Sequence, residues 1–266
     1  ESALELVYSE NMFNVPDASA AVRDYASQGY DLVIAHGSQY GTFIETLAPE
    51  FPETAFAWGT DVNTFGLDNV YAYTAAAEEG GYVNGVMAGL MSDSGRIGVT
   101  GPVEVGDART YISGFVQGVE SVRPDAQVSQ TWTGSFSDVA LMTAAAQTHI
   151  SNGADVLTGS SQSVVGSIGA AQEAGDVLWF GTQAEQTSLA PELVVASQVY
   201  DWAMMLEEMI ANAQGGVYGG ESYVLTLENE GLKMAYNDGF DIPDEVIEAA
   251  EAAIEGIVDG SITVEP

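Results

Sequence analysis

The sequence holds no strong catalytic signature of fixed spacing. It has neither a G-x-G-x-x-G or P-loop phosphate cradle nor a G-x-S-x-G nucleophile elbow. Its two histidines, His36 and His149, show no H-E-x-x-H spacing, and cysteine is absent. Thiolate catalysis and Cys-ligated zinc are therefore excluded. We expect a protein that is not an enzyme and that uses no metal and no cofactor.

The loops that follow the predicted strands are rich in aromatic, amide and hydroxyl side chains. Aromatic walls with a few placed hydrogen-bonding groups are typical of a pocket for a flat, polar and largely uncharged molecule. In open α/β sheets such a ligand binds beyond the carboxyl ends of the strands. Our candidate ligand-binding residues are Tyr40, Trp58, Asp61, Phe136, Asp138, Gln183, Gln198 and Tyr200.

Several candidates also have a purely structural explanation. Trp58 ends an apolar strand, where it could simply pack between sheet and helix. Asp138 directly precedes a predicted helix and fits the N-cap position, where a side-chain oxygen accepts a hydrogen bond from the helix backbone. Tyr40 differs, because it lies in a turn between Gly37 and Gly41 where a large aromatic has no evident core role. We expect Tyr40 to form a wall of the ligand site.

The elements that must position these residues alternate between short apolar runs and helical segments. Such alternation predicts parallel βαβ units, and the continuous apolar runs predict sheets covered on both faces. We expect helices at 18–28, 43–51, 75–91, 108–121, 139–151, 164–174, 201–213 and 243–258. The expected strands or apolar runs are 4–8, 31–35, 54–58, 70–73, 96–100, 127–133, 154–158, 177–181, 193–197 and 223–227.

This number of strands is large for one sheet, so we predict two doubly wound lobes joined by a hinge. The fold class is α/β. The first predicted lobe comprises residues 1–93 and 199–222, and the second comprises residues 94–198 and 223–242. The helix in residues 243–266 is assigned to neither lobe.

The charge of the chain is strongly one-sided. It carries 39 Asp and Glu against 5 Lys and Arg, a formal net charge of −34. A nucleic-acid binder needs a basic surface, so that class is excluded, and docking on anionic lipid is disfavoured. Apolar residues make up 46% of the chain, which argues against disorder as the cause. We interpret the charge as adaptation to salty, marine or halophilic surroundings, with an ordinary acidic exported protein as the alternative.

Six segments in order resemble the basic membrane protein (BMP) family of solute-binding lipoproteins, which includes purine nucleoside receptors of ABC importers. They are GYDLVIAHGSQYGTFIETLAPEFPE (29–53), AAAEEGGYVNGVMAGLMSDSGRIGVTGP (75–102), GFVQGVESVRPD (114–125), TGSFSDV (133–139), GADVLTGSSQSVVGSIGAAQEAG (153–175) and LWFGTQAEQ (178–186). The resemblance implies a type I periplasmic-binding-protein fold of two lobes that close on a ligand, without catalysis.

The sequence also departs from the family pattern. The first family strand, with its ligand-binding loop, is expected to lie before residue 1 and is absent here. Family members that hold a ribose have an Asp at the position of Gln183 in this chain. They also have a Lys at a position that falls near Tyr200 here. An amide thus replaces a carboxylate and a phenol replaces a cation. The aromatic positions of the family are retained as Tyr40 and Phe136.

Together these observations predict a solute-binding protein that captures a purine nucleoside, a nucleobase or a similar heterocycle between its lobes and delivers it to an ABC permease. Tyr40 and Phe136 would sandwich the ring, and Gln183, Gln198 and Asp61 would contact its polar edges. The alternatives are a ligand sensor of the same fold for a different solute and a nucleoside hydrolase. The resemblance implies a periplasmic or extracellular location and contact with the membrane only through a lipid anchor outside this chain.

Overall fold

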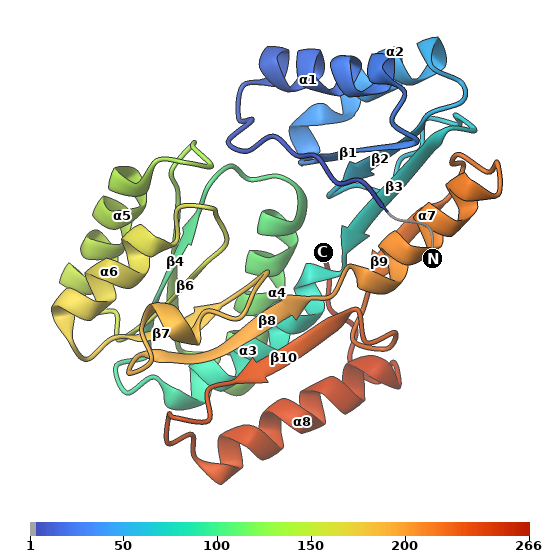
Figure 1. Ribbon diagram of the computed structural model, residues 1–266. Coiled ribbons are helices and arrows are strands. Elements are labelled where there is room, and N and C mark those ends of the chain that lie inside the picture. Colours follow the sequence, from blue (N-terminus) through green and yellow to red (C-terminus); the bar gives the residue numbers. More distant parts are fainter. Residues whose placement is uncertain (1–3) are drawn as a thin grey trace. The chain divides into compact units, whose positions relative to one another are not determined.

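The computed structural model describes residues 4–266, which form two compact units (Figure 1). The first unit comprises Glu1–Thr74 and Met205–Tyr223, and the second comprises Ala75–Met204 and Val224–Pro266. The chain therefore passes from the first unit to the second and back before it ends in the second. The predicted α/β architecture of two lobes with parallel sheets is confirmed.

The first unit contains a four-stranded sheet in the order β1-β2-β3-β9, in which β1, β2 and β3 are parallel. In Figure 1, α1 and α2 lie along one side of this sheet and α7 lies along the other. Its elements are α1 (Val15–Gln28), β1 (Leu32–His36), η1 (Ser38–Tyr40), α2 (Gly41–Leu47), η2 (Ala48–Glu50), β2 (Ala55–Gly59), β3 (Val70–Ala75), α7 (Ala203–Gln214) and β9 (Ser222–Leu225). The last residue of β3, the first two of α7 and the last two of β9 already count with the second unit.

Local sequence signals set the limits of the first helix. The side chain of Asn14 caps α1 by accepting a hydrogen bond from the backbone of Asp17, and Pro16 stands in the first turn. Gly29 ends the helix in the left-handed conformation, with φ of 85°, a geometry in which glycine avoids the penalty of a Cβ. This is the helix end that the sequence predicted.

The second unit contains a six-stranded sheet in the order β10-β8-β7-β6-β4-β5, in which only β10 runs antiparallel to its neighbour. Its elements are α3 (Ala77–Met91), β4 (Arg96–Gly101), α4 (Gly106–Val122), β5 (Gln127–Trp132), α5 (Val139–Ser151), β6 (Val156–Gly159), α6 (Val165–Ala174), β7 (Leu178–Gly181), η3 (Thr187–Leu189), β8 (Val194–Tyr200), β10 (Leu232–Tyr236) and α8 (Asp244–Val258).

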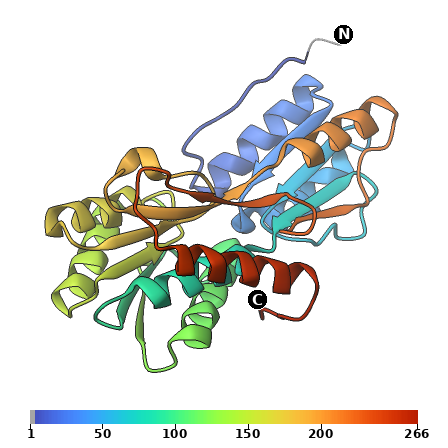
Figure 2. The same cartoon turned by 90° about the horizontal axis from the view of Figure 1, so that it is seen from below.

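Two apolar cores cover the two faces of this sheet. In one core α3, α4 and α8 pack against strand residues such as Val99 and Val195, and in the other α5 and α6 pack against strand residues such as Leu157 and Trp179. Figure 2 shows α8 beside α3, which agrees with their packing contact. Burial on both faces explains why β4, β6 and β7 are apolar runs without polar alternation.

Glycines let α3 and α4 approach each other at backbone distance. A Cβ at Gly85 would come within 2.1 Å of the carbonyl oxygen of Phe115, and one at Gly118 would come within 2.1 Å of that of Tyr82. This close packing places α3 in the second compact unit. The boundary between the compact units therefore falls before Ala75, whereas the predicted lobes divide at residues 93 and 94.

Most predicted elements are present, with ends displaced by a few residues. The helix predicted at 43–51 is a shorter α2 followed by η2, and the strand predicted at 193–197 continues to Tyr200 as β8. The apolar run at 4–8 forms no strand. The edge strand β10 was not predicted, because its residues are mostly half-buried and show no apolar run.

Candidate ligand-binding site

The parallel strands of the second unit end together at one edge of the sheet. There β4, β6 and β7 each finish at a glycine, namely Gly101, Gly159 and Gly181, and β8 finishes at Tyr200. The turns that follow carry polar side chains beyond this edge. This is the position at which open α/β sheets bind ligands.

Three polar side chains from three of these turns form what we call the Gln183 cluster: Asp107, Ser160 and Gln183. The Gln183 amide nitrogen Nε2 donates to Oδ2 of Asp107 at 2.9 Å and lies 3.3 Å from the hydroxyl oxygen of Ser160. Asp107 lies in the first turn of α4, and Ser160 directly follows β6. All three side chains meet at the carboxyl edge of the sheet.

The backbone at Gln183 is unusual, with φ of 72° in the left-handed region. Non-glycine residues in this region are uncommon and cluster at functional sites. The Gln183 carbonyl oxygen accepts a hydrogen bond from the backbone of Tyr200 at 3.2 Å, so the turn after β7 is joined to the end of β8. The structure thus brings together two residues that the sequence predicted for the site.

The Tyr200 hydroxyl is buried and lies near the Thr182 side chain, but it makes no hydrogen bond of full geometry within the described residues. Burial raises the pKa of this phenol well above its usual value, and the negative charge of Asp107 adds to the effect. The Tyr200 ring makes an edge-to-face contact with Trp202, with centroids 5.6 Å apart. Tyr200 is therefore a neutral phenol next to the Gln183 cluster.

Gln198 lies deeper than the sequence predicted. Its side chain is fully buried, with Oε1 accepting from the Thr182 hydroxyl at 2.7 Å and Nε2 donating to the Ala77 carbonyl at 3.1 Å. A Cβ at Gly80 would come within 2.6 Å of this amide. Gln198 thus links β8 to the first residue of α3 by a hydrogen bond. A contact between Gln198 and a ligand remains a prediction.

The loop between β5 and α5 carries Phe136 and Asp138. Its backbone is held by the hydroxyls of Ser161 and Ser163, which donate to the Phe136 carbonyl at 2.9 and 3.1 Å, and the Phe136 side chain is half-buried. This loop therefore lies against the turn that bears Ser160. Asp138 is the N-cap of α5 and accepts from the backbone of Leu141 at 3.0 Å, which is the structural alternative that the sequence offered.

In the first unit, Tyr40 lies in the turn after β1, and Trp58 lies within β2, next to its last residue. Tyr40 is only 6% exposed and its hydroxyl donates to the Met12 carbonyl, so this turn residue does have a packing role. Trp58 stacks on Phe65 with centroids 5.0 Å apart and donates from Nε1 to the Gly37 carbonyl at 3.0 Å. Contacts of either ring with a ligand remain predictions.

Asp61 shapes its own loop. Its Oδ1 accepts hydrogen bonds from the backbone of Val62 at 2.7 Å and of Asn63 at 2.9 Å, the pattern of an Asx turn. Close by in the same sheet, Nδ1 of His36 lies 3.0 Å from the Tyr73 hydroxyl. The sequence predicted Asp61 as a site residue, but it did not pair His36 with Tyr73.

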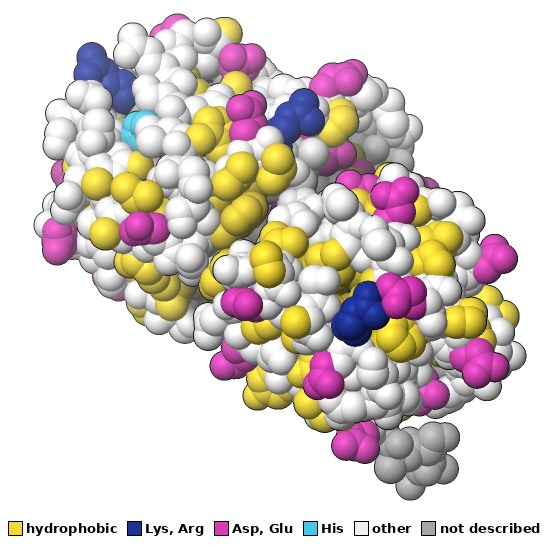
Figure 3. Space-filling view, turned by 90° about the horizontal axis from the view of Figure 1, so that it is seen from above, with side chains coloured by type: hydrophobic (Ala, Val, Ile, Leu, Met, Phe, Trp, Pro, Cys, Tyr) yellow, Lys and Arg dark blue, Asp and Glu magenta, His cyan; other side chains and the backbone are white. Residues whose placement is uncertain are grey.

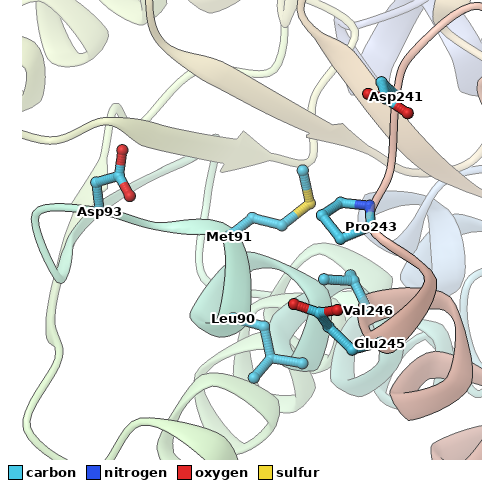
Figure 4. Close-up of a pocket in the computed structure, with 7 residues that line it drawn as sticks. All are labelled: Leu90, Met91, Asp93, Asp241, Pro243, Glu245 and Val246. Atoms are coloured by element: carbon cyan, nitrogen blue, oxygen red, sulfur yellow. The ribbon is translucent and has the colours of Figure 1, made fainter.

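A cavity of about 320 Å³ lies elsewhere in the second unit, beside the end of α3 and the start of α8 (Figure 4). Figure 4 shows Met91, Pro243 and Val246 in the middle of the lining with the carboxylate of Glu245 beside Val246, whereas Asp93 and Asp241 lie farther out. None of the predicted site residues lines this cavity.

No group of three or more His, Asp or Glu side chains within residues 4–266 is placed to hold a metal ion.

A family model described as "ABC transporter substrate-binding protein PnrA-like" matches residues 1–260. The chain belongs to this Bmp family. Members are solute-binding proteins rather than enzymes, and ABC transporter substrate-binding proteins are extracytoplasmic. The predicted family is thereby confirmed. No helix in the described part of the chain has both the length and the apolar character needed to cross a bilayer.

Named relatives of this Bmp protein include solute-binding proteins of several organisms. It is 28% identical over 259 residues to a purine-binding protein of Brucella abortus, a match that covers 97% of this chain and 72% of the relative. It is 23% identical to a putative ABC transporter glucose-binding protein of Haloferax volcanii, covering 98% and 65% respectively. It is 24% identical to a nucleoside-binding protein of Lactococcus lactis, covering 95% and 77%.

Solved structures support the same fold for this Bmp protein. A solute-binding protein of an ABC transporter from Conexibacter woesei superposes with a TM-score of 0.74 at 24% identity, covering 97% of this chain and 86% of that one. One from Aeropyrum pernix gives a TM-score of 0.85 at 19% identity, covering 94% and 81%. At these identities the superpositions establish the fold alone.

Proposed function

We propose that this Bmp protein captures a purine nucleoside, a purine base or a closely similar heterocycle and delivers it to an ABC permease. The observation that carries the proposal is the match along 97% of the chain to a relative named as purine-binding. The nucleoside-binding name of the Lactococcus relative supports the same solute class. The predicted lipid anchor outside residues 1–266 remains part of this proposal.

In this proposal the site residues have divided roles. Tyr40 and Phe136 supply aromatic faces for the heterocycle, since stacked rings gain more than their buried area alone provides. Gln183 and Asp61 contact polar edges of the solute. Tyr200 adds a phenol hydroxyl that is already buried away from water. Pairing this hydroxyl with a solute atom therefore costs little further free energy of desolvation.

The test is calorimetric titration with a panel of purine bases, purine nucleosides and monosaccharides. We expect saturable binding of at least one purine compound, which chromatography then recovers unchanged. Gln183→Ala should weaken that binding by about tenfold, the loss of one or two hydrogen bonds. Gln172→Ala is the matched control, because Gln172 is an exposed glutamine of α6. Conversion of the solute would overturn the proposal.

A monosaccharide is the second candidate solute. The glucose-binding name of the Haloferax relative, matched over 98% of this chain, favours it. A sugar needs several placed amide, hydroxyl and carboxylate partners, and the Gln183 cluster supplies one of each. Binding of glucose without binding of any purine compound would decide for this candidate.

We further propose that the protein works in salty surroundings. The formal charge of −34 supports this proposal. On the face drawn in Figure 3, Asp and Glu side chains are scattered widely, whereas Lys and Arg are sparse. Dissolved ions screen repulsion among such charges, so this surface is best tolerated at high ionic strength.

A further inference from the structure

The side-chain amide nitrogen of Gln183 already has hydrogen-bond partners within the protein. Nε2 carries two protons, and its two partners are Oδ2 of Asp107 at 2.9 Å and the Ser160 hydroxyl oxygen at 3.3 Å. We propose that Asp107 is a specificity-determining residue: it fixes the Gln183 amide so that only the amide oxygen can contact the solute. This wall of the site then selects a solute by its N–H or O–H groups.

The orientation follows from the hydrogen-bonding capacities of the two side chains. An ionised carboxylate has only acceptors, whereas a glutamine amide has a donor end and an acceptor end. The end of Gln183 that faces Asp107 must therefore be the NH₂ group. If Asp107 were an amide or a hydroxyl, either end of Gln183 could face it and the orientation would be free.

An amide oxygen held in one orientation discriminates between solutes with and without a hydrogen-bond donor more strongly than an amide that can rotate. A solute that offers a donor pairs with it, whereas a solute that lacks the donor leaves a desolvated acceptor unpaired. A rotating amide avoids this cost, since it can present its NH₂ group to an acceptor of the solute instead. Asp107 therefore affects selectivity between solutes more than it affects affinity for any one of them.

The local backbone supports a fixed side chain. Gln183 stands in a left-handed conformation, and its carbonyl is tied to the backbone of Tyr200. Ser160, by accepting from the amide, keeps its own O–H available as a donor. The purely structural alternative is that Asp107 only complements the N-terminus of α4, where acidic residues are favourable. That role would affect stability and leave selectivity unchanged.

The selectivity test rests on the proposed binding of purine compounds and uses Asp107→Asn, with Glu104→Gln as the matched control. Both variants change a carboxylate to an amide in the segment between β4 and the first turn of α4, and Glu104 is exposed. The probes are two pairs that differ in donors: adenine with N6,N6-dimethyladenine, and inosine with 2′,3′-dideoxyinosine. Calorimetry gives the Kd ratio within each pair for the wild type and both variants.

We expect the wild type to prefer the donor-bearing member of at least one pair by about tenfold. Asp107→Asn should reduce that ratio by about fivefold, and Glu104→Gln should leave it unchanged. Equal binding within both pairs by the wild type would overturn the proposal. An unchanged ratio in Asp107→Asn, or the same reduction in Glu104→Gln, would overturn it too.

A second measurement separates this proposal from the proposed function, because it needs no solute. NMR records how fast the side-chain amide protons of Gln183 exchange with water, with their signals identified by their loss in Gln183→Ala. We expect slow exchange in the wild type and in Glu104→Gln, and faster exchange in Asp107→Ala. If no purine compound binds, the purine proposal fails and this measurement alone decides whether Asp107 holds the amide. Equal exchange rates in all three proteins would show that it does not.

Discussion

Asp138 has two candidate roles, as the N-cap of α5 and as a ligand contact, and a pair of variants can separate them. As the N-cap of α5 it satisfies the backbone N–H of Leu141, an end group that the helix itself leaves unpaired. We expect Asp138→Ala to lower the free energy of unfolding by about 1 kcal/mol in urea titrations, the usual contribution of a cap. Asp138→Asn should restore it, because asparagine caps helices equally well.

The same pair tests the predicted contact with the solute. A capping role alone leaves the solute Kd of Asp138→Asn equal to that of the wild type. If Asp138→Asn is as stable as the wild type yet binds its solute several times more weakly, the carboxylate itself contacts the solute. The cap then serves a second purpose at the site.

His149 leads to a prediction about how the stability of the protein depends on pH. It lies on α5, is 5% exposed, and its Nε2 has no hydrogen-bond partner among the described residues. Burial lowers its pKa below the ordinary 6.5. Between the folded and unfolded pKa values the unfolded state binds more protons, so stability is lost as the pH falls below about 6.5.

The expected outcome is a difference between two proteins, because the many carboxylates also titrate as the pH falls. Urea midpoints measured at pH 7.5 and pH 5 should fall further for the wild type than for His149→Gln, which buries a neutral amide in place of the imidazole. Equal falls in both proteins would show that the imidazole stays uncharged across this range or is protonated without cost.

At the scale of elements, the contact between α3 and α4 depends on residues that have no side chain. Gly85 and Gly118 face backbone carbonyls at distances that a Cβ cannot occupy. We expect Gly118→Ala to force the helices apart and to lower the free energy of unfolding by about 1–3 kcal/mol or more, as overpacking does. Urea denaturation measures this loss.

Gly169 on α6 is the control, since a Cβ there would meet nothing within 4 Å. Gly169→Ala should stabilise the protein by up to about 1 kcal/mol, because alanine is the better helix former. A stabilised Gly118→Ala would mean that the two helices tolerate a wider separation. The glycines would then not be the reason that α3 packs within the second unit.

The sequence predicted the alternation of strands and helices well, because fully buried strands are continuous apolar runs. It missed β10, whose Leu-Lys-Met-Ala-Tyr sequence is mostly half-buried at the sheet edge. Within the candidate site it identified Gln183 and Tyr200, since each stands at or just beyond the end of a strand. It missed Asp107, because an acidic residue in the first turn of a helix is ordinary and nothing in the spacing pairs it with Gln183.

The formal net charge of −34 acts over longer distances than any single contact, because like charges repel across the entire surface. Between 0.05 M and 2 M NaCl the screening length falls to about 3 Å or less, so repulsion among the carboxylates is nearly removed. We expect the Tm to rise by roughly 10 °C, equivalent to about 3 kcal/mol for a chain of this length. Scanning calorimetry measures the rise, and KCl at the same concentrations, which screens charges equally, should give a similar rise.

A local reversal of charge tests whether repulsion is the cause. Glu248, Glu251 and Glu255 are exposed on α8 at spacings of three and four residues, where like charges repel by about 0.2–0.5 kcal/mol per pair. Glu251→Lys turns both repulsions into attractions and should raise the Tm by about 2–4 °C at 0.05 M NaCl, with Glu251→Gln intermediate. Both gains should vanish in 2 M NaCl, since screening removes repulsion and attraction alike. A gain that persists in 2 M NaCl would come from helix propensity or packing, and the salt dependence of the whole protein would then need a cause other than its charge.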